Sequence, residues 1–421
     1  MIGAINSMRW RPQRRQSGGG QSSPVSRDRD FPARRDARID LLRGFALVSI
    51  FVDHIPGNTL GLLTMRNFGL ADAAELFVLL AGFSSMTAYG RCFERDGVGP
   101  GLRRVVRRCL RLYLFQVGLL LSALLIVRLW ARQFGLEPWV DGPLLHGTAI
   151  RHGLVLAALP ANLDILPLYI VLLAAFPLLY ALLRFNLFLG LAISAALWLT
   201  ANCVPGLNLP NTTTGTGWFF NPLAWQFLFA LGAALAMVIR RGGAVPRRTW
   251  LIALAWGYIG FSLFAAAPWR SWGWPNVQLI PIAAPDKTLL SPLRLLDALA
   301  VVYVALAADA FRRFAERGRL ALVQACGRHS LEIFSIGTIL SLLGRLLFDT
   351  VGTGAAPQLL VNAGGLFLLL AAGRILDRPP VPPLRRPPLR ENGHFGAPAL
   401  GLSSLPVGYR QRGEGDGAGR G

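Results

Sequence analysis

The sequence predicts an all-α, polytopic integral membrane protein with about ten transmembrane helices and both termini in the cytoplasm. Of its 421 residues, 53% are hydrophobic and only 15% are charged, which is too apolar for a soluble globular domain. Apolar runs of roughly 17–25 residues, the length that crosses a bilayer, recur along the chain. Arginines cluster in alternate connections between these runs.

Ten apolar runs have a membrane-spanning length. They lie near residues 41–58, 73–90, 112–129, 166–183, 186–203, 223–239, 250–267, 294–309, 330–348 and 357–375. Three connections, 130–165, 204–222 and 268–293, are longer than a tight turn requires, and we expect an external ligand to meet the protein there. Residues 147–159 are predicted to form a short helix that lies on or dips into the membrane, because it is too short to cross.

The distribution of basic residues predicts which connections face the cytoplasm. Arginine is abundant in segments 1–38, 91–111, 240–248 and 312–319, whereas segments 204–222 and 349–356 contain no basic residue. Because cytoplasmic loops carry an excess of Lys and Arg, both termini are expected on that side. The net charge of +21 therefore reflects topology, and nucleic acid is not an expected partner.

The chain is predicted to contain one transmembrane domain, residues 36–377, between two disordered cytoplasmic tails. Residues 1–35 are rich in Gly, Ser, Arg and Pro, and residues 378–421 in Pro, Gly and Arg, without periodicity. Segment 1–38 has no apolar core of signal-peptide length, so the first helix is expected to be a signal anchor. The four cysteines have no paired spacing, so neither a disulfide framework nor a metal site is predicted.

The first predicted helix, from Asp40 to Asn58, contains ionisable residues, which are functional candidates inside a bilayer because burying them is costly. Arg43 and His54 lie on one face of this helix, about 16 Å apart along its axis. A guanidinium can bind phosphate bidentately, and an imidazole is suited to take a proton from a hydroxyl near neutral pH. The alternative is that Arg43 is a further cytoplasmic-side arginine and His54 an interfacial residue beside Asp53.

Two acidic residues begin the second predicted helix. Asp72 and Glu75 are three residues apart and share a face. With Arg66 as counter-ion they would line a cavity, and the alternative is that these charges only neutralise one another at the helix start. Lys287, the only lysine, is expected to form a solvated pair with Asp286.

Seven blocks of the sequence resemble a known family. RIDLLRG (38–44), DHIPGN (53–58), LTMRNFG (63–69), DAAELF (72–77), LDILPLY (163–169), WFFNPLAWQ (218–226) and HSLEIF (329–334) look like blocks of the OpgC family. This family belongs with the wider acyltransferase family three, which is marked by an Arg, ten residues and a His in the first helix. Arg43 and His54 stand at that spacing. The superfamily's Ser-Gly-Phe block appears here as Ala81-Gly82-Phe83, so its Ser is absent.

OpgC proteins are membrane enzymes that succinylate osmoregulated periplasmic glucans. The resemblance therefore implies a multi-pass O-acyltransferase of the bacterial inner membrane. It would transfer an acyl group, expected to be succinyl, from a cytoplasmic acyl-CoA to hydroxyls of a periplasmic glucan. Succinyl-CoA is the expected donor substrate, and no tightly bound cofactor is expected.

The resemblance also implies roles for individual residues. His54 is expected to be the general base that takes the proton of the attacking sugar hydroxyl, with Asp53 or Glu75 orienting its imidazole. Because neighbours on a helix point about 100° apart, Asp53 is a flawed orienter, and Asp72 or Asp164 are alternatives. Arg43 and Asp40 are expected at the donor site. The expected glucan-binding residues are Arg66, Asn67, Asp72, Asp164, Asn221 and Gln226. Aromatic residues of the exported connections, among them Trp218, Phe219, Phe220 and Trp225, would either stack on sugars or anchor the protein at the membrane interface.

Three other functions stay open on the sequence alone. One is an O-acetyltransferase of another cell-envelope polysaccharide. A second is a transporter in which Arg43, Asp53, His54 and Glu75 line an ion path, although no internal inverted repeat supports it. The third is a membrane scaffold or sensor, which gives no reason for an Arg and His stripe through the bilayer.

Overall fold

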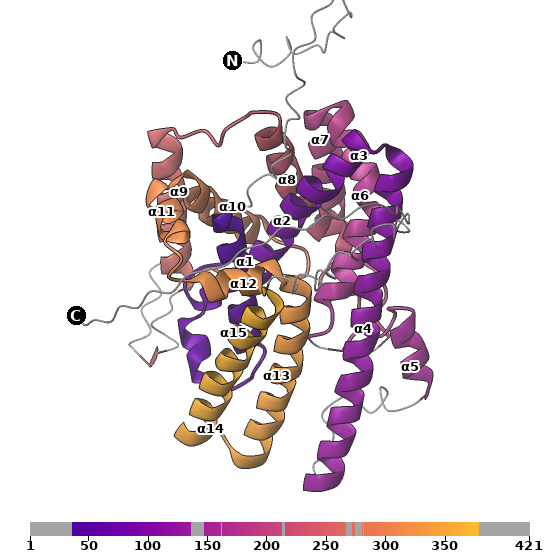
Figure 1. Ribbon diagram of the computed structural model, residues 1–421, viewed down its shortest axis with the longest axis vertical. Coiled ribbons are helices and arrows are strands. Elements are labelled where there is room, and N and C mark those ends of the chain that lie inside the picture. Colours follow the sequence, from indigo (N-terminus) through magenta and orange to yellow (C-terminus); the bar gives the residue numbers. More distant parts are fainter. Residues whose placement is uncertain are drawn as a thin grey trace, which may run out of the picture. The chain divides into compact units, whose positions relative to one another are not determined.

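The computed structural model describes residues 36–135, 147–160, 162–212, 215–266, 272–273, 280 and 282–378. The two predicted tails lie outside these residues, apart from Arg378. Helices account for most of the described chain (Figure 1), and only an isolated bridge between Pro210 and Gly217 has β character there. The predicted all-α class is therefore confirmed for the described residues.

The structure contains fifteen α-helices in the described residues. They are α1 (Ala37–Asp53), α2 (Ala73–Ser85), α3 (Arg91–Arg95), α4 (Val98–Phe134), α5 (Gly147–Leu154), α6 (Ile165–Phe185), α7 (Leu187–Cys203), α8 (Pro222–Arg240), α9 (Thr249–Ala266), α10 (Pro292–Ala307), α11 (Asp309–Glu316), α12 (Ala321–Arg328), α13 (Ser330–Val351), α14 (Ala355–Leu359) and α15 (Gly365–Leu376). π-Helical turns at Met86–Gly90 and Leu360–Gly364 make α2–α3 and α14–α15 continuous. Short 3₁₀ turns, Thr59–Leu63 and Met65–Asn67, lie between α1 and α2.

Seven helical segments of the described chain are long and apolar enough to cross a membrane, which makes this a multi-pass membrane protein. They are Ala73–Arg95, Val98–Phe134, Ile165–Phe185, Pro222–Arg240, Thr249–Ala266, Ser330–Val351 and Ala355–Leu376. The other three predicted spans coincide with α1, α7 and α10, which have 17, 17 and 16 residues. The count of ten and the side of the termini stay predictions.

Two predicted boundaries are wrong, each for a local reason. The first helix ends at Asp53 rather than Asn58, because Pro56 cannot supply a helical N–H and Gly57 has φ +76°. The predicted connection 91–111 is largely helical, so α4 begins at Val98 instead of residue 112. Arginine is a good helix former, which lets α4 continue beyond its apolar run.

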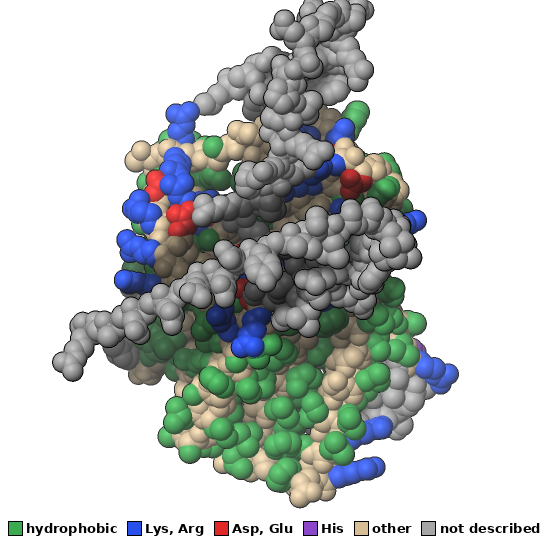
Figure 2. All heavy atoms as spheres, in the orientation of Figure 1, with side chains coloured by type: hydrophobic (Ala, Val, Ile, Leu, Met, Phe, Trp, Pro, Cys, Tyr) green, Lys and Arg blue, Asp and Glu red, His purple; other side chains and the backbone are tan. Residues whose placement is uncertain are grey.

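Helix α1 is enclosed by other helices. It packs against α12, α2 and α13, and α2 in turn packs extensively against α8. Leu41, Ala46 and Phe51 on α1 are at most 1% exposed. Hydrophobic side chains instead cover the outer face over α13, α14 and α15 (Figure 2). The charges of α1 are thus surrounded by protein, where polar partners and cavities can accommodate them.

Glycines allow two helix pairs to approach at backbone distance. A Cβ atom at Gly327 of α12 would lie 1.9 Å from the carbonyl oxygen of Asp40, and one at Gly44 would lie 2.0 Å from that of Val323. The α2–α8 crossing is similar, since a Cβ atom at Gly232 would lie 1.9 Å from the carbonyl oxygen of Leu79. Small residues at such crossings permit close packing of membrane helices. The α1–α12 contact fixes the position of α1 relative to α12.

Replacing Gly327 by alanine is expected to lower the free energy of unfolding by about 1–3 kcal/mol, because the new methyl group meets backbone atoms and forces the helices apart. Gly118→Ala on α4 is the matched control, since a Cβ atom there has no neighbour within 4 Å. That control should be neutral or slightly stabilising, because alanine favours helix. Thermal unfolding of the purified variants in detergent measures both effects. Equal melting temperatures would contradict the packing argument.

Candidate active site

A large cavity lies beside the N-terminal half of α1. Its volume is about 1260 Å³, and we call it the basic cavity because it is lined by Arg38, Arg43, Arg91, Arg95, Arg104, Arg108, Arg111, Arg240 and Arg328. Its acidic lining residues are fewer, namely Asp36, Asp40, Asp96 and Glu332. This excess of guanidinium groups favours a ligand with several negative charges, and phosphate groups match guanidinium geometry well.

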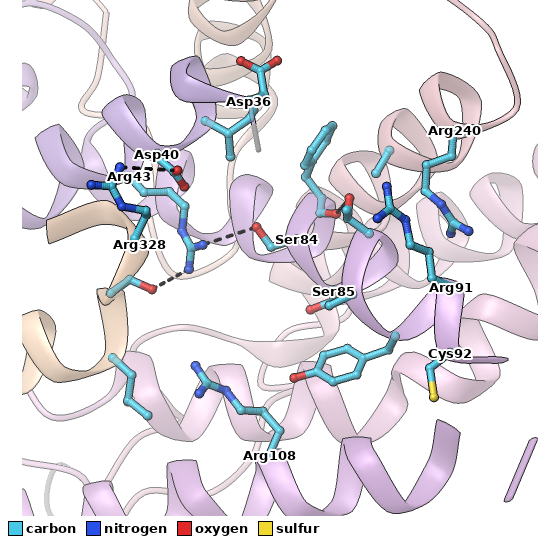
Figure 3. Close-up of a pocket in the computed structure, with 18 of the residues that line it drawn as sticks. Asp36, Asp40, Arg43, Ser84, Ser85, Arg91, Cys92, Arg108, Arg240 and Arg328 are labelled. Carbon is cyan, nitrogen blue, oxygen red and sulfur yellow. Dashed lines mark hydrogen bonds and ion pairs between the residues drawn. The ribbon is translucent and has the colours of Figure 1, made fainter. Parts of the chain in front are cut away.

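Arg43 points into the basic cavity (Figure 3). Its two terminal nitrogens donate to the hydroxyls of Ser84, at 3.4 Å, and Ser330, at 2.5 Å. Asp40, also predicted at the donor site, lines the same cavity and lies 4.0 Å from Arg328. Arg328 is bound more closely by Asp377, at 2.6 Å, and a carboxylate such as that of Asp40 repels phosphate, so its position does not suit direct contact with the phosphates of a donor.

The two hydroxyls beside Arg43 were not predicted as site residues. Ser84 lies three positions after Ala81, the first residue of the Ala81-Gly82-Phe83 block. Residues three apart lie on one face of a helix, so Ser84 carries a hydroxyl one turn further along that face. The signal in the sequence is that Ser84 directly follows the Ala81-Gly82-Phe83 block. Ser330 belongs to the HSLEIF block, and only the packing of α13 near α1 reveals its role.

A second, smaller cavity lies at the other end of α1. Its volume is about 120 Å³, and we call it the His54 cavity. Its polar lining residues are Asp53, His54, Arg66, Asp72, Asp164 and Lys287, and its apolar lining residues are Ile50, Ala73, Ala74, Ile165, Phe220 and Phe334. Five predicted site residues from three separate segments therefore meet here. A charged, partly apolar pocket of this size suits a reacting group rather than a whole ligand.

The imidazole of His54 is held at the wall of this cavity. Its Nδ1 atom is buried and has no hydrogen-bond partner in the described chain, which leaves Nε2 as the nitrogen that can reach the cavity. Asp53 is engaged elsewhere, since its carboxylate accepts a 2.5 Å hydrogen bond from Thr64 and lies 3.8 Å from Nε of Arg66. Among the described residues, no hydrogen bond joins a carboxylate to His54. The orienting role predicted for Asp53 therefore has no contact to support it.

Asp164 faces the same cavity from the residue before α6. Burial raises the pKa of Asp164 to about 6, against small opposing effects of backbone hydrogen bonds and the charge of Lys287. Its side chain does not cap α6. Asp164 is thus the predicted carboxylate whose position best suits contact with a ligand beside His54.

Glu75 is occupied by an ion pair outside the His54 cavity. It is fully buried and accepts a 2.7 Å hydrogen bond from Nε of Arg294 on α10. Its other oxygen accepts from the backbone N–H of Asp72, while Asp72 accepts from the N–H of Ala74, which forms a capping box at the start of α2. Glu75 was predicted to be catalytic, but these contacts favour a structural role.

Asp72 is bound by two cations. Arg294 lies 3.1 Å from its carboxylate and Lys287 lies 2.5 Å from it. Burial opposes ionisation of Asp72, but these positive charges outweigh burial and hold the pKa of Asp72 below its ordinary range. The expectation that Lys287 pairs with Asp286 in solvent is therefore wrong. The sequence could not predict the Lys287–Asp72 and Arg294–Asp72 ion pairs, because each links segments more than 200 residues apart.

Three amide side chains predicted to bind glucan make internal contacts instead. Asn67 donates to the carbonyl of Gly61 at 2.6 Å. Asn221 caps α8 and donates to Leu207 at 2.7 Å. Gln226 donates to the backbone carbonyl of Ser194 on α7 at 2.7 Å. None of the three lines either cavity.

Only about one helical turn separates the two cavities. On α6, Ile165 lines the His54 cavity and Tyr169 the basic cavity, so they are about 6 Å apart along the helix. On α13, Phe334 and Leu331 are related in the same way, about 4.5 Å apart. Phe334 packs on Phe77 with a ring separation of 6.3 Å. A narrow apolar septum that includes Phe334 therefore lies between the arginine-lined basic cavity and the His54 cavity.

Comparison with known families gives one match. The model of the family described as OpgC protein matches residues 35–379 of this chain. No curated protein and no solved structure matches. The matched range contains every described residue that lines the two cavities.

Proposed function

This chain belongs to the OpgC family and is an OpgC-like membrane acyltransferase, and we propose that it succinylates a periplasmic glucan from a cytoplasmic acyl-CoA. The observation that carries this proposal is the pair of cavities on one helix. The basic cavity has the charge and size for a nucleotide donor, and the His54 cavity has the size for a reacting group. Their separation by one turn suits a donor whose phosphates and thioester lie at opposite ends of a flexible arm.

The donor is proposed to bind from the cytoplasm. The basic cavity is lined by arginines of the predicted cytoplasmic connection, in agreement with the excess of positive charge on that side of membrane proteins. Arg43 would hold a phosphate of the donor at the inner end of this cavity. The acyl thioester would then pass the apolar septum and reach His54.

His54 is proposed to act as the general base. A sugar hydroxyl entering from the periplasmic side would give its proton to Nε2 as its oxygen attacks the thioester carbon. Asp164, on the wall of the same cavity, would hold a second hydroxyl of the sugar or the protonated imidazole. Arg66, whose side chain is about half exposed, stands where the glucan would approach.

The proposal is tested by producing the chain in a bacterial host that lacks glucan succinylation. Mass spectrometry of the periplasmic glucans should show mass increments of succinyl groups. Increments of acetyl groups instead would assign a different donor. Unmodified glucans beside well-folded protein in the membrane would reject the proposed function.

Arg43→Ala is expected to raise the KM for the acyl-CoA donor about 10-fold or more, because hydrogen bonds to charged groups contribute about 1.5–3 kcal/mol. The KM for glucan should stay unchanged, since Arg43 does not line the His54 cavity. Arg374→Ala, at an exposed position on α15, serves as the control for loss of one arginine. Initial rates in membranes at varied donor concentration measure the effect. An unchanged donor KM would exclude the phosphate-binding role.

A further inference from the structure

Lys287 occupies a position that an ordinary surface lysine does not. It is the only lysine of the chain, and its side chain is one of the two cationic side chains that line the described His54 cavity. Its side chain is 28% exposed and meets Asp72 on one side. The rings of Phe219 and Phe220 lie 5.9 and 5.7 Å from its ammonium nitrogen on another. The ammonium group is therefore confined at the cavity wall rather than free in solvent.

The backbone of Lys287 is also fixed. Its carbonyl oxygen accepts a 3.0 Å hydrogen bond from Nε1 of Trp225, which is fully buried on α8. The next carbonyl, that of Thr288, accepts from the N–H of Asn221. The aromatic block 218–226 thus supplies two rings around the ammonium and two hydrogen bonds that hold its backbone. Three aromatic residues of this block, Phe219, Phe220 and Trp225, therefore contact Lys287.

The ammonium group keeps unused hydrogen-bond donors. Lysine has three N–H donors, and one of them is engaged by Asp72. The other described contacts of the ammonium are with ring faces, which do not replace a strong acceptor. Because Lys287 lines the His54 cavity, these donors can reach an acceptor placed beside the imidazole. The ion pair with Asp72 also argues against a nucleophilic role, since a protonated amine has no free electron pair.

We propose that Lys287 is a catalytic residue that stabilises the oxyanion formed during acyl transfer in the His54 cavity. This inference rests on the proposed function and adds the electrophilic half of the site. General-base catalysis by His54 leaves negative charge on the thioester carbonyl oxygen, and the site needs a preorganised donor for that charge. Lys287 provides it without reorganisation, because its position is fixed before substrate enters.

The chemical step then balances. The sugar oxygen attacks the carbonyl carbon of the thioester, a C–O bond forms, and the hydroxyl proton passes to Nε2 of His54. The carbonyl electron pair moves onto oxygen, which accepts hydrogen bonds from the ammonium of Lys287. On collapse the C=O bond re-forms and the C–S bond breaks. The proton on His54 goes to the departing thiolate, giving the ester and free CoA.

Lys287→Met tests this role, because methionine keeps an unbranched side chain but removes the charge and the donors. We expect kcat to fall about 10²–10³-fold, the usual cost of removing one oxyanion donor, while the KM values for donor and glucan change little. Asp286→Asn is the control for perturbing the same loop and should retain wild-type kcat. A Lys287→Met protein with kcat near that of wild type would overturn the proposal. Loss of succinyl transfer with retained acetyl transfer would also overturn it, since Lys287 would then bind the free carboxylate of the succinyl group instead of the oxyanion.

A second measurement does not depend on a folded variant. Because Lys287 is the only lysine, labelling the wild-type protein with ¹³Cε-lysine gives a single lysine signal in NMR. A thioether analogue of the donor that retains the carbonyl should shift this signal, whereas CoA without an acyl group should not. An analogue that inhibits competitively but leaves the signal in place would contradict the assignment. Glucan acylation by the wild-type protein is measured separately. Absence of that acylation would reject the proposed function, whereas acylation without the NMR shift would reject only the role of Lys287.

Discussion

Replacing His54 by glutamine should lower the rate of acyl transfer by about 10²–10⁴-fold, the usual contribution of a positioned general base. Glutamine has a comparable size and keeps polar atoms at the cavity wall, but it cannot accept the hydroxyl proton near neutral pH. The loss should therefore appear in kcat, with the protein inserted and folded as wild type. Steady-state rates in membranes and thermal unfolding in detergent measure the two quantities.

His152→Gln is the matched control for this substitution. His152 is exposed on α5 and lines neither cavity, so its replacement should leave kcat unchanged. Acylation by His54→Gln at more than a tenth of the wild-type rate would remove His54 from the role of base. In that case Asp164, the other titratable group suited to accept a proton in the cavity, becomes the candidate.

Replacing Arg294 by methionine should cost about 3–5 kcal/mol of unfolding free energy, the range found when one partner of a buried ion pair is removed. Glu75 is 0% exposed and would lose the cation that contacts it at 2.7 Å. The start of α2 should suffer directly, because Asp72 and Glu75 form its capping box and both contact Arg294. Unfolding in detergent followed by circular dichroism measures the change.

The double variant Arg294→Met with Glu75→Gln separates charge from packing. It removes the uncompensated carboxylate, so a large part of the lost stability should return. Arg374→Met on α15 controls for loss of an exposed arginine and should stay within about 0.5 kcal/mol of wild type. If the double variant is as unstable as Arg294→Met alone, the damage comes from lost packing rather than from a buried charge.

Local patterns in the sequence were sufficient to locate the apolar helices. Each predicted apolar run coincides with a helix, because the length of an apolar run is a property of consecutive residues. The helix boundaries depended instead on the helix-breaking or helix-forming preference of individual residues. Pro56 and Gly57 shortened α1, and the helical preference of arginine lengthened α4 beyond its apolar segment.

The two cavities at opposite ends of α1 were also foreseeable in part. The spacing of Arg43 and His54 is a helical periodicity, and both residues line cavities at the two ends of the same helix. Asp53, Arg66, Asp72 and Asp164 were named from their charge and from the family resemblance, and they meet at the His54 cavity. The periodicity could not predict which of these carboxylates is free to contact a ligand.

By itself, the sequence determined that this chain spans a membrane and that Arg43 and His54 lie near opposite ends of its first helix. Only the tertiary structure decided the ion pairs. Arg294 pairs with Glu75, 219 residues away in the sequence, and Lys287 pairs with Asp72, 215 residues away. The tertiary structure also showed that Trp225 donates to the backbone of Lys287 and that Asn221 donates to the backbone of Leu207 and Thr288. The physical reason is that helix length and face are set by neighbours in the chain. An ion pair or a cavity depends instead on which distant helices pack together.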